Sequence, residues 1–143
     1  MTSTPGLLTL IAILLLTGAL GVWWRVRSGR LRQQQASSAP VLSAEQIGAA
    51  LGERATLVQF SSAFCQPCRT TRLILAQVSE DVPGVRHVEI DAESNLGLVR
   101  ELDILRTPTV LILDRAGRVA FRASGAPRRD QVHAVLGRLD GAA

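Results

Sequence analysis

The sequence predicts an α/β domain with a mixed central sheet flanked by helices, preceded by one transmembrane helix. Two observations lead to this prediction. Residues 7–24 are uncharged and mostly aliphatic. From Ser43 onward, short β-prone runs alternate with helical patterns, as is typical of α/β proteins. The chain has 143 residues, and removing the apolar stretch leaves room for a single domain with one core.

The apolar stretch 7–24 is long enough to cross a bilayer, because a helix of this length reaches roughly 27 Å. Trp23 and Trp24 close the stretch, where aromatic side chains favour the membrane interface. Four arginines follow at once: Arg25, Arg27, Arg30 and Arg32. The positive-inside rule therefore predicts a single-pass cell-membrane protein with its domain on the cytoplasmic side. A secretory signal would carry its charge before the apolar run and a cleavage site after it, so we expect no cleavage.

The charge balance argues against nucleic-acid binding. Sixteen basic residues exceed twelve acidic ones, but four basic residues belong to the arginine cluster, and the remaining twelve equal the acids in number. A nucleic-acid binder would carry its basic surplus on the folded domain. We therefore expect the lipid bilayer, through residues 7–24, as a partner and no nucleic acid.

The segment between the membrane and the domain is predicted to be a flexible linker. After the arginines, Gln33 to Pro40 are polar and small without apolar periodicity. The expected division is a short N-terminal segment at 1–6, a transmembrane helix at 7–24, an Arg-rich juxtamembrane segment and linker at 25–42, and the folded domain at 43–143.

The elements of the domain are expected in the order α-βαβ-α-ββα. Ser43 and Gln46 have the spacing of a capping box, so a first helix should begin there. The remaining pattern predicts that this helix ends near Glu53, with strands at 56–60, 85–91, 108–113 and 118–124, helices over 65–81, after Ser94 and after Pro127, and a turn at 114–117. The helical connection makes the first two strands parallel, and the tight turn makes the last two antiparallel.

The chemistry of the sequence lies in Cys65 and Cys68, which are separated by Gln66 and Pro67. Cys65 falls at the first turn of a predicted helix, where free N–H groups and the helix dipole stabilise a thiolate. We therefore assign Cys65 as the nucleophile. Cys68 lies one turn later on the same side, where it can resolve a mixed disulfide. Pro67 suits a first helical turn because it lacks only an N–H that would have no partner there.

Two alternatives stand beside this assignment. A zinc site needs four ligands, and only His87, His133 or carboxylates could join the two cysteines. A purely structural disulfide would close a loop too short to stabilise the fold much. A Cys-x-x-Cys pair that follows a strand and opens a helix instead favours a redox dithiol, and we expect neither a metal nor a bound cofactor.

The run from Val58 to Cys68, with the later Thr107-Pro108-Thr109, resembles the thioredoxin family. The resemblance extends from about Ser43 to the C-terminus. It implies a thioredoxin-like fold and a membrane-anchored thiol-disulfide oxidoreductase.

The resemblance also implies roles for individual residues. Pro108 would be cis and face the dithiol, and the backbone of Thr107 would pair with a substrate peptide in strand fashion. Gly125 is similar to a glycine at the rim of the family's active site, where a side chain would obstruct the peptide. A simple turn glycine is the alternative for Gly125.

Several positions depart from the common family pattern. Phe64 replaces a tryptophan and Gln66 replaces a glycine, which we expect to alter the surface and the redox potential of the site. Gln59 replaces a buried acid that looks like the proton acceptor for the resolving cysteine, and an amide cannot titrate. His87 replaces a lysine near that acid. Gln59 and His87 are therefore candidates for a proton relay, with an ordinary half-exposed histidine as the alternative.

The first functional hypothesis is a membrane-tethered protein-disulfide reductase that acts on protein disulfide substrates. Its electrons would come from a reductase of the thioredoxin-reductase type or from a small thiol, because the chain has no nucleotide-binding glycine motif. A second hypothesis places the same domain outside, in extracytoplasmic disulfide reduction or cytochrome c maturation. A third makes it a non-catalytic binding module with an idle dithiol.

Overall fold

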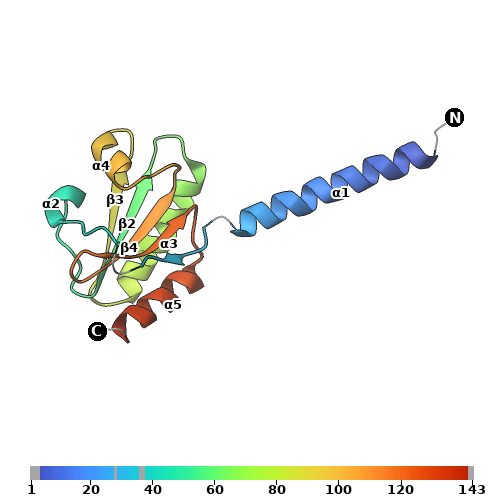
Figure 1. Ribbon diagram of the computed structural model, residues 1–143. Helices are drawn as coiled ribbons and strands as arrows, with labels where there is room; N and C mark the ends of the chain where they lie inside the picture. The colour runs from blue at the N-terminus through green and yellow to red at the C-terminus, as the bar shows by residue number, and fades with distance from the viewer. Residues whose placement is uncertain (1–3, 28, 36–37, 142–143) are drawn as a thin grey trace.

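The computed structural model describes residues 4–27, 29–35 and 38–141, and Figure 1 shows a long helix that projects from a folded domain. The long helix is α1 (Thr4–Arg27). The domain contains β1 (Arg32–Gln33), α2 (Ala44–Ile47), β2 (Ala55–Ser61), α3 (Gln66–Asp81), β3 (Val85–Asp91), α4 (Leu96–Glu101), β4 (Thr109–Asp114), β5 (Val119–Ser124) and α5 (Arg129–Asp140).

The sheet is mixed, as the sequence predicts. Its strand order is β1-β5-β4-β2-β3. Strand β2 runs parallel to β3 and antiparallel to β4, and the β4–β5 hairpin is antiparallel. The parallel pair is connected by α3, whereas the hairpin closes through the short turn after Asp114.

Helices cover both faces of the sheet, and each face has its own apolar core. On one face, side chains such as Leu57 and Ile112 pack with residues of α3 and α5. On the other face, Val58 and Leu111 pack with Ile47 of α2 and with the residues of α4. Neighbouring residues of β2 and of β4 thus point to opposite cores, as the alternation of a strand requires. The predicted α/β architecture is confirmed.

Two predicted helix boundaries differ from the structure. The helix expected to reach Glu53 stops at Ile47, because Gly48 takes a left-handed conformation with φ 70° and ends it. Ser43 does form the predicted capping box with Gln46. Asn95, not Ser94, precedes α4, because the Ser94 hydroxyl hydrogen-bonds to the Asp91 carboxylate. The last helix begins at Arg129, two residues after Pro127, as predicted.

The segment from Gln33 to Pro40, predicted to be a flexible linker within 25–42, is paired with the domain in the part that the structure describes. Strand β1 pairs antiparallel with the edge strand β5. The Leu42 N–H donates to the Gly117 carbonyl at 2.8 Å, and the Leu42 side chain is only 1% exposed. The open edge of β5 carries unpaired backbone groups, and the segment satisfies them. Residues 28, 36 and 37 lie outside the described residues, as do residues 1–3 of the expected N-terminal segment.

A single glycine fixes where this segment meets the domain. Gly29 has φ 85°, and its N–H donates to the Ser124 carbonyl at 3.1 Å. A Cβ at this position would lie 2.2 Å from the Ala126 carbonyl oxygen. Only glycine allows this close approach, so the chain leaving α1 is held against the end of β5.

Helix α1 is long and apolar enough to cross a membrane by its length and composition. The candidate span is Gly6–Trp24, and none of it is buried inside the structure. A signal sequence near an N-terminus meets the same criteria.

We expect Leu42→Ala to lower the free energy of unfolding by about 2–5 kcal/mol, because the substitution leaves a cavity in the core. Its neighbour Val41 is 56% exposed and supplies the control, since Val41→Ala should change stability by about 0.5 kcal/mol or less. Denaturant unfolding of the full chain measures both. Equal, small effects of the two substitutions would mean that this segment does not belong to the folded unit.

Candidate active site

Cys65 and Cys68 lie where the chain passes from β2 into α3. Cys65 is the N-cap residue of α3, and the backbone N–H of Cys68 donates to its sulfur at 3.2 Å. The two sulfurs are bonded at 2.01 Å, so the structure holds the oxidised pair. Pro67 stands in the first turn, where the missing N–H leaves no bond unmade. The N-terminal end of α3 therefore offers its dipole and an N–H to a Cys65 thiolate.

The two cysteines differ in accessibility. Cys68 is 2% exposed, whereas Cys65 is partly exposed. Phe64, just before the pair, is fully exposed at 100%, and Gln66 and Pro67 are also exposed. An incoming disulfide would therefore reach Cys65 before Cys68, over a surface formed by these neighbours.

Thr107, Pro108 and Gly125 come together near the dithiol loop. The Thr107–Pro108 peptide bond is cis, as the resemblance implies. The Thr107 hydroxyl and the Ser62 hydroxyl hydrogen-bond at 3.0 Å, which joins this loop to the one that leads into Cys65. The Gly125 N–H donates to the Pro108 carbonyl at 2.7 Å, and its φ of 120° favours glycine.

The sheet explains why these loops meet. The pairing of β4 opposes Thr109 to Phe60 of β2 and to Ser124 of β5. The last residues of β2 and β5 therefore lie beside the first residue of β4, at one end of the sheet. The segments that leave β2 and β5, and the segment that enters β4, emerge together there.

Gln59 lies beneath the pair and is fully buried. Its amide nitrogen donates to the Ser61 hydroxyl and to the Cys68 carbonyl, both at 2.9 Å. Its amide oxygen accepts from His87 Nε2 at 3.2 Å. The structure thus brings both relay candidates together, but the bond from Gln59 reaches the backbone of Cys68 and not its sulfur.

His87 is half-buried on β3 and is held in its neutral form. Burial lowers its pKa, with a further contribution from the nearby Arg72 charge, while Glu89 opposes the shift. Because a carbonyl oxygen can only accept, the proton of neutral His87 sits on Nε2, facing Gln59.

The sequence reasoning missed an ion pair beside His87. Arg72 of α3 contacts Glu89 of β3 through Nε at 2.6 Å and Nη2 at 2.8 Å. Burial alone would raise the Glu89 pKa, but hydrogen bonds from Arg72 and Ser61 outweigh it and lower that pKa. With Ser61 and Asp91, this pair lines a cleft of about 330 Å³ next to the Ser62–Ala63 loop. The sequence signal for this contact was that Arg72 lies four residues after Cys68, one helical turn further along the same side of α3.

Within the part of the chain that the structure describes, no three His, Cys, Asp or Glu side chains gather closely enough to hold a metal ion. The functional groups gathered at this site are the two cysteine sulfurs and the hydrogen-bond donors around them.

Comparisons with known proteins agree on one family. The thioredoxin family model, described as Thioredoxin, matches residues 41–138. Thioredoxin domain-containing protein 2 of Homo sapiens is 39% identical over 72 residues, covering 48% of this chain and 13% of that protein. Thioredoxin H5 of Oryza sativa subsp. japonica is 28% identical over 60 residues, covering 42% of this chain and 44% of that protein. The chain thus spans less than half the length of both these curated relatives.

A solved structure shows the same fold. The crystal structure of a chloroplastic thioredoxin z superposes with a TM-score of 0.61 and is 30% identical, covering 70% of this chain and 92% of that one. The predicted thioredoxin-like fold is confirmed.

The lowered pKa of His87 predicts how stability depends on pH. Unfolded His87 binds a proton below its ordinary pKa of 6.5, whereas the folded form resists protonation until a lower pH. The stability of the neutral folded form is therefore present above pH 6.5 and is lost as the pH falls through the folded pKa. We expect His87→Asn to remove this loss, because asparagine does not titrate.

Urea unfolding of the oxidised wild type and of His87→Asn, measured from pH 7 downward, checks this prediction. The wild type should lose stability relative to the variant as the pH falls below about 6.5. Parallel curves for the two proteins would contradict it.

Proposed function

Because this chain belongs to the thioredoxin family, we propose that it is a membrane-tethered protein-disulfide reductase. One observation supports this most directly: Cys65 is partly exposed and caps α3, whereas Cys68 is buried directly behind it. Such an asymmetric pair is suited to an attacking thiol and a resolving thiol.

The proposed reaction has two steps. The Cys65 thiolate attacks one sulfur of a substrate disulfide, forms a mixed disulfide and releases the first substrate thiolate. The Cys68 thiolate then attacks the Cys65 sulfur, forms the Cys65–Cys68 disulfide and releases the second. Two electrons pass to the substrate, and a reductase or a small thiol must return them. No bound cofactor is required.

The neighbouring loops would position the substrate. The backbone of Thr107 would pair with the peptide, and Pro108 would shape the surface opposite the dithiol. Gly125, which is hydrogen-bonded to Pro108, has no side chain and would therefore leave room for the peptide to bind beside the dithiol. Phe64, fully exposed beside Cys65, would supply an apolar contact in place of the usual tryptophan.

A proton relay is the proposed role of His87 and Gln59. The resolving step needs Cys68 to lose its proton, and Gln59 cannot accept one. The hydrogen bonds from His87 to Gln59 and from Gln59 to the Cys68 carbonyl all donate toward Cys68, so they position the imidazole, and the proton of the Cys68 thiol would be taken up at Nδ1, the ring nitrogen that carries none. An unchanged pH dependence of turnover in His87→Asn would rule out this role.

Cysteine substitutions test the reaction. Cys65→Ser should abolish reduction of a protein disulfide, because the attacking sulfur is gone. Cys68→Ser should accumulate a mixed disulfide with the substrate, because the second step is blocked. Non-reducing electrophoresis and mass spectrometry detect that species. A Cys65 inert toward alkylating reagents at neutral pH would favour a binding module with an idle dithiol instead.

Membrane tethering by α1 and a cytoplasmic domain complete the proposal. The apolar span Gly6–Trp24 and the arginines that follow it support both. A reporter fused after Ala143, active on only one side of the membrane, should place the domain in the cytoplasm. An extracytoplasmic signal would instead assign the same chemistry to disulfides outside the cell. Release of the reporter from the membrane would show that the segment is a cleaved signal.

A further inference from the structure

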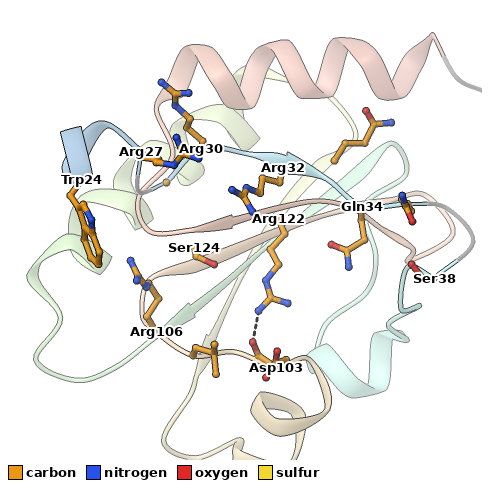
Figure 2. A pocket seen from close by; sticks show the side chains of 14 residues that line it. Trp24, Arg27, Arg30, Arg32, Gln34, Ser38, Asp103, Arg106, Arg122 and Ser124 are labelled. Atoms are coloured by element: carbon orange, nitrogen blue, oxygen red, sulfur yellow. Dashed lines mark hydrogen bonds between the residues drawn. The ribbon is translucent and has the colours of Figure 1, made fainter. Parts of the chain in front are cut away.

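A basic groove lies where α1 meets the domain (Figure 2). Its volume is about 740 Å³, and its walls come from the end of α1, from β1 and β5, and from the loop that precedes Thr107. Five arginines line it, namely Arg27, Arg30, Arg32, Arg106 and Arg122, and Asp103 is the one acid among the lining residues. Arg106 and Arg122 lie outside the juxtamembrane cluster that the sequence shows, so the groove is more than that cluster.

Two of the arginines are neighbours on adjacent strands of the sheet. Arg32 and Arg122 are direct partners in the antiparallel β1–β5 ladder, so their side chains project from the same face. Like charges in this arrangement destabilise a sheet unless a counter-charge is near. Arg122 donates to the carbonyls of Leu102 at 2.7 Å and Asp103 at 2.5 Å, and Figure 2 shows the second of these bonds. Carbonyls orient the guanidinium without neutralising it, and Asp103 is the one carboxylate among the lining residues to offset five arginines.

The groove opens at the level where lipid headgroups would lie. Trp24, the last residue of the candidate membrane span, is itself one of its lining residues. Interfacial tryptophans sit at the headgroups, so a groove beginning at Trp24 meets phosphate groups. Guanidinium groups bind phosphate oxygens through paired, charge-assisted hydrogen bonds.

We propose that the basic groove binds the phosphate of an anionic phospholipid. This inference rests on the membrane tether of the proposed function. Arg106 directly precedes Thr107, and Ser124, another lining residue, directly precedes Gly125. A headgroup in the groove therefore holds the proposed substrate loops near the membrane surface and favours disulfides located there.

Arginines that directly follow a membrane helix attract anionic lipid without any contribution from the domain. Arg106 lies outside that cluster, so Arg106→Gln is the variant that tests the groove itself. Arg106 is exposed, and its change removes one charge from the groove wall. Arg115→Gln is the matched control, since Arg115 is exposed in the turn between β4 and β5, at the far end of the hairpin. Circular dichroism verifies that both variants are folded.

Native mass spectrometry of the full chain in detergent, with equal phosphatidylglycerol and phosphatidylcholine, measures the binding. We expect the wild type and Arg115→Gln to retain phosphatidylglycerol preferentially, and Arg106→Gln to lose about five-fold of that preference. Equal retention of both lipids, or an Arg106→Gln variant that matches the wild type, would overturn the proposal.

Two further arms separate the alternatives. Inorganic phosphate should not displace the bound phosphatidylglycerol at comparable concentration, and displacement would mean that the groove takes free phosphate rather than lipid. Alkaline extraction of membranes that contain the chain tests the tether independently. A chain that is extracted contradicts the tether and with it the groove, whereas a retained chain without lipid preference contradicts the groove alone.

Discussion

Strand β2 lies between β3 and β4, and every residue from Ala55 to Ser61 is buried. A strand in this position must supply apolar side chains to both faces, and Leu57 and Val58 do so in alternation. The same burial dictates the site. The face that packs on α3 also carries Gln59, and the strand ends where a short loop leads to Cys65. The core and the dithiol are therefore positioned by one element.

A neutral amide in the interior sets the electrostatics of the site. Gln59 bonds to Ser61, to Cys68 and to His87, and so connects β2, α3 and β3 without a buried charge. Charge appears one layer outward, in the Arg72–Glu89 pair. Since burial keeps His87 neutral, the surroundings of Cys68 offer an imidazole in place of the carboxylate that the family pattern would lead one to expect.

Much of this arrangement could be predicted from the sequence because it depends on local patterns. Strand 85–91 was predicted with its observed bounds, and the Cys-x-x-Cys motif and the Thr107-Pro108 pair gave the fold and the dithiol. Contacts between distant segments could not be predicted in this way. The linker is mostly polar, and its few apolar residues, among them Val41 and Leu42, form no periodic pattern that would predict its joining the sheet. That Arg32 and Arg122 are cross-strand neighbours could not be predicted, because it depends on the register of β1 against β5, and no local sequence pattern specifies that register.

The proposed function requires that Cys65 and Cys68 form a reversible dithiol of reducing character. The reduction potential of the full chain, equilibrated in glutathione buffers with Cys65→Ser as the control, measures this property. A fragment starting at Ser43 would be unsuitable, because it lacks β1 and the buried Leu42. We expect reversible titration at a potential near that of glutathione or lower. A potential well above that of glutathione would identify an oxidant, and the absence of reversible titration would contradict a redox function altogether.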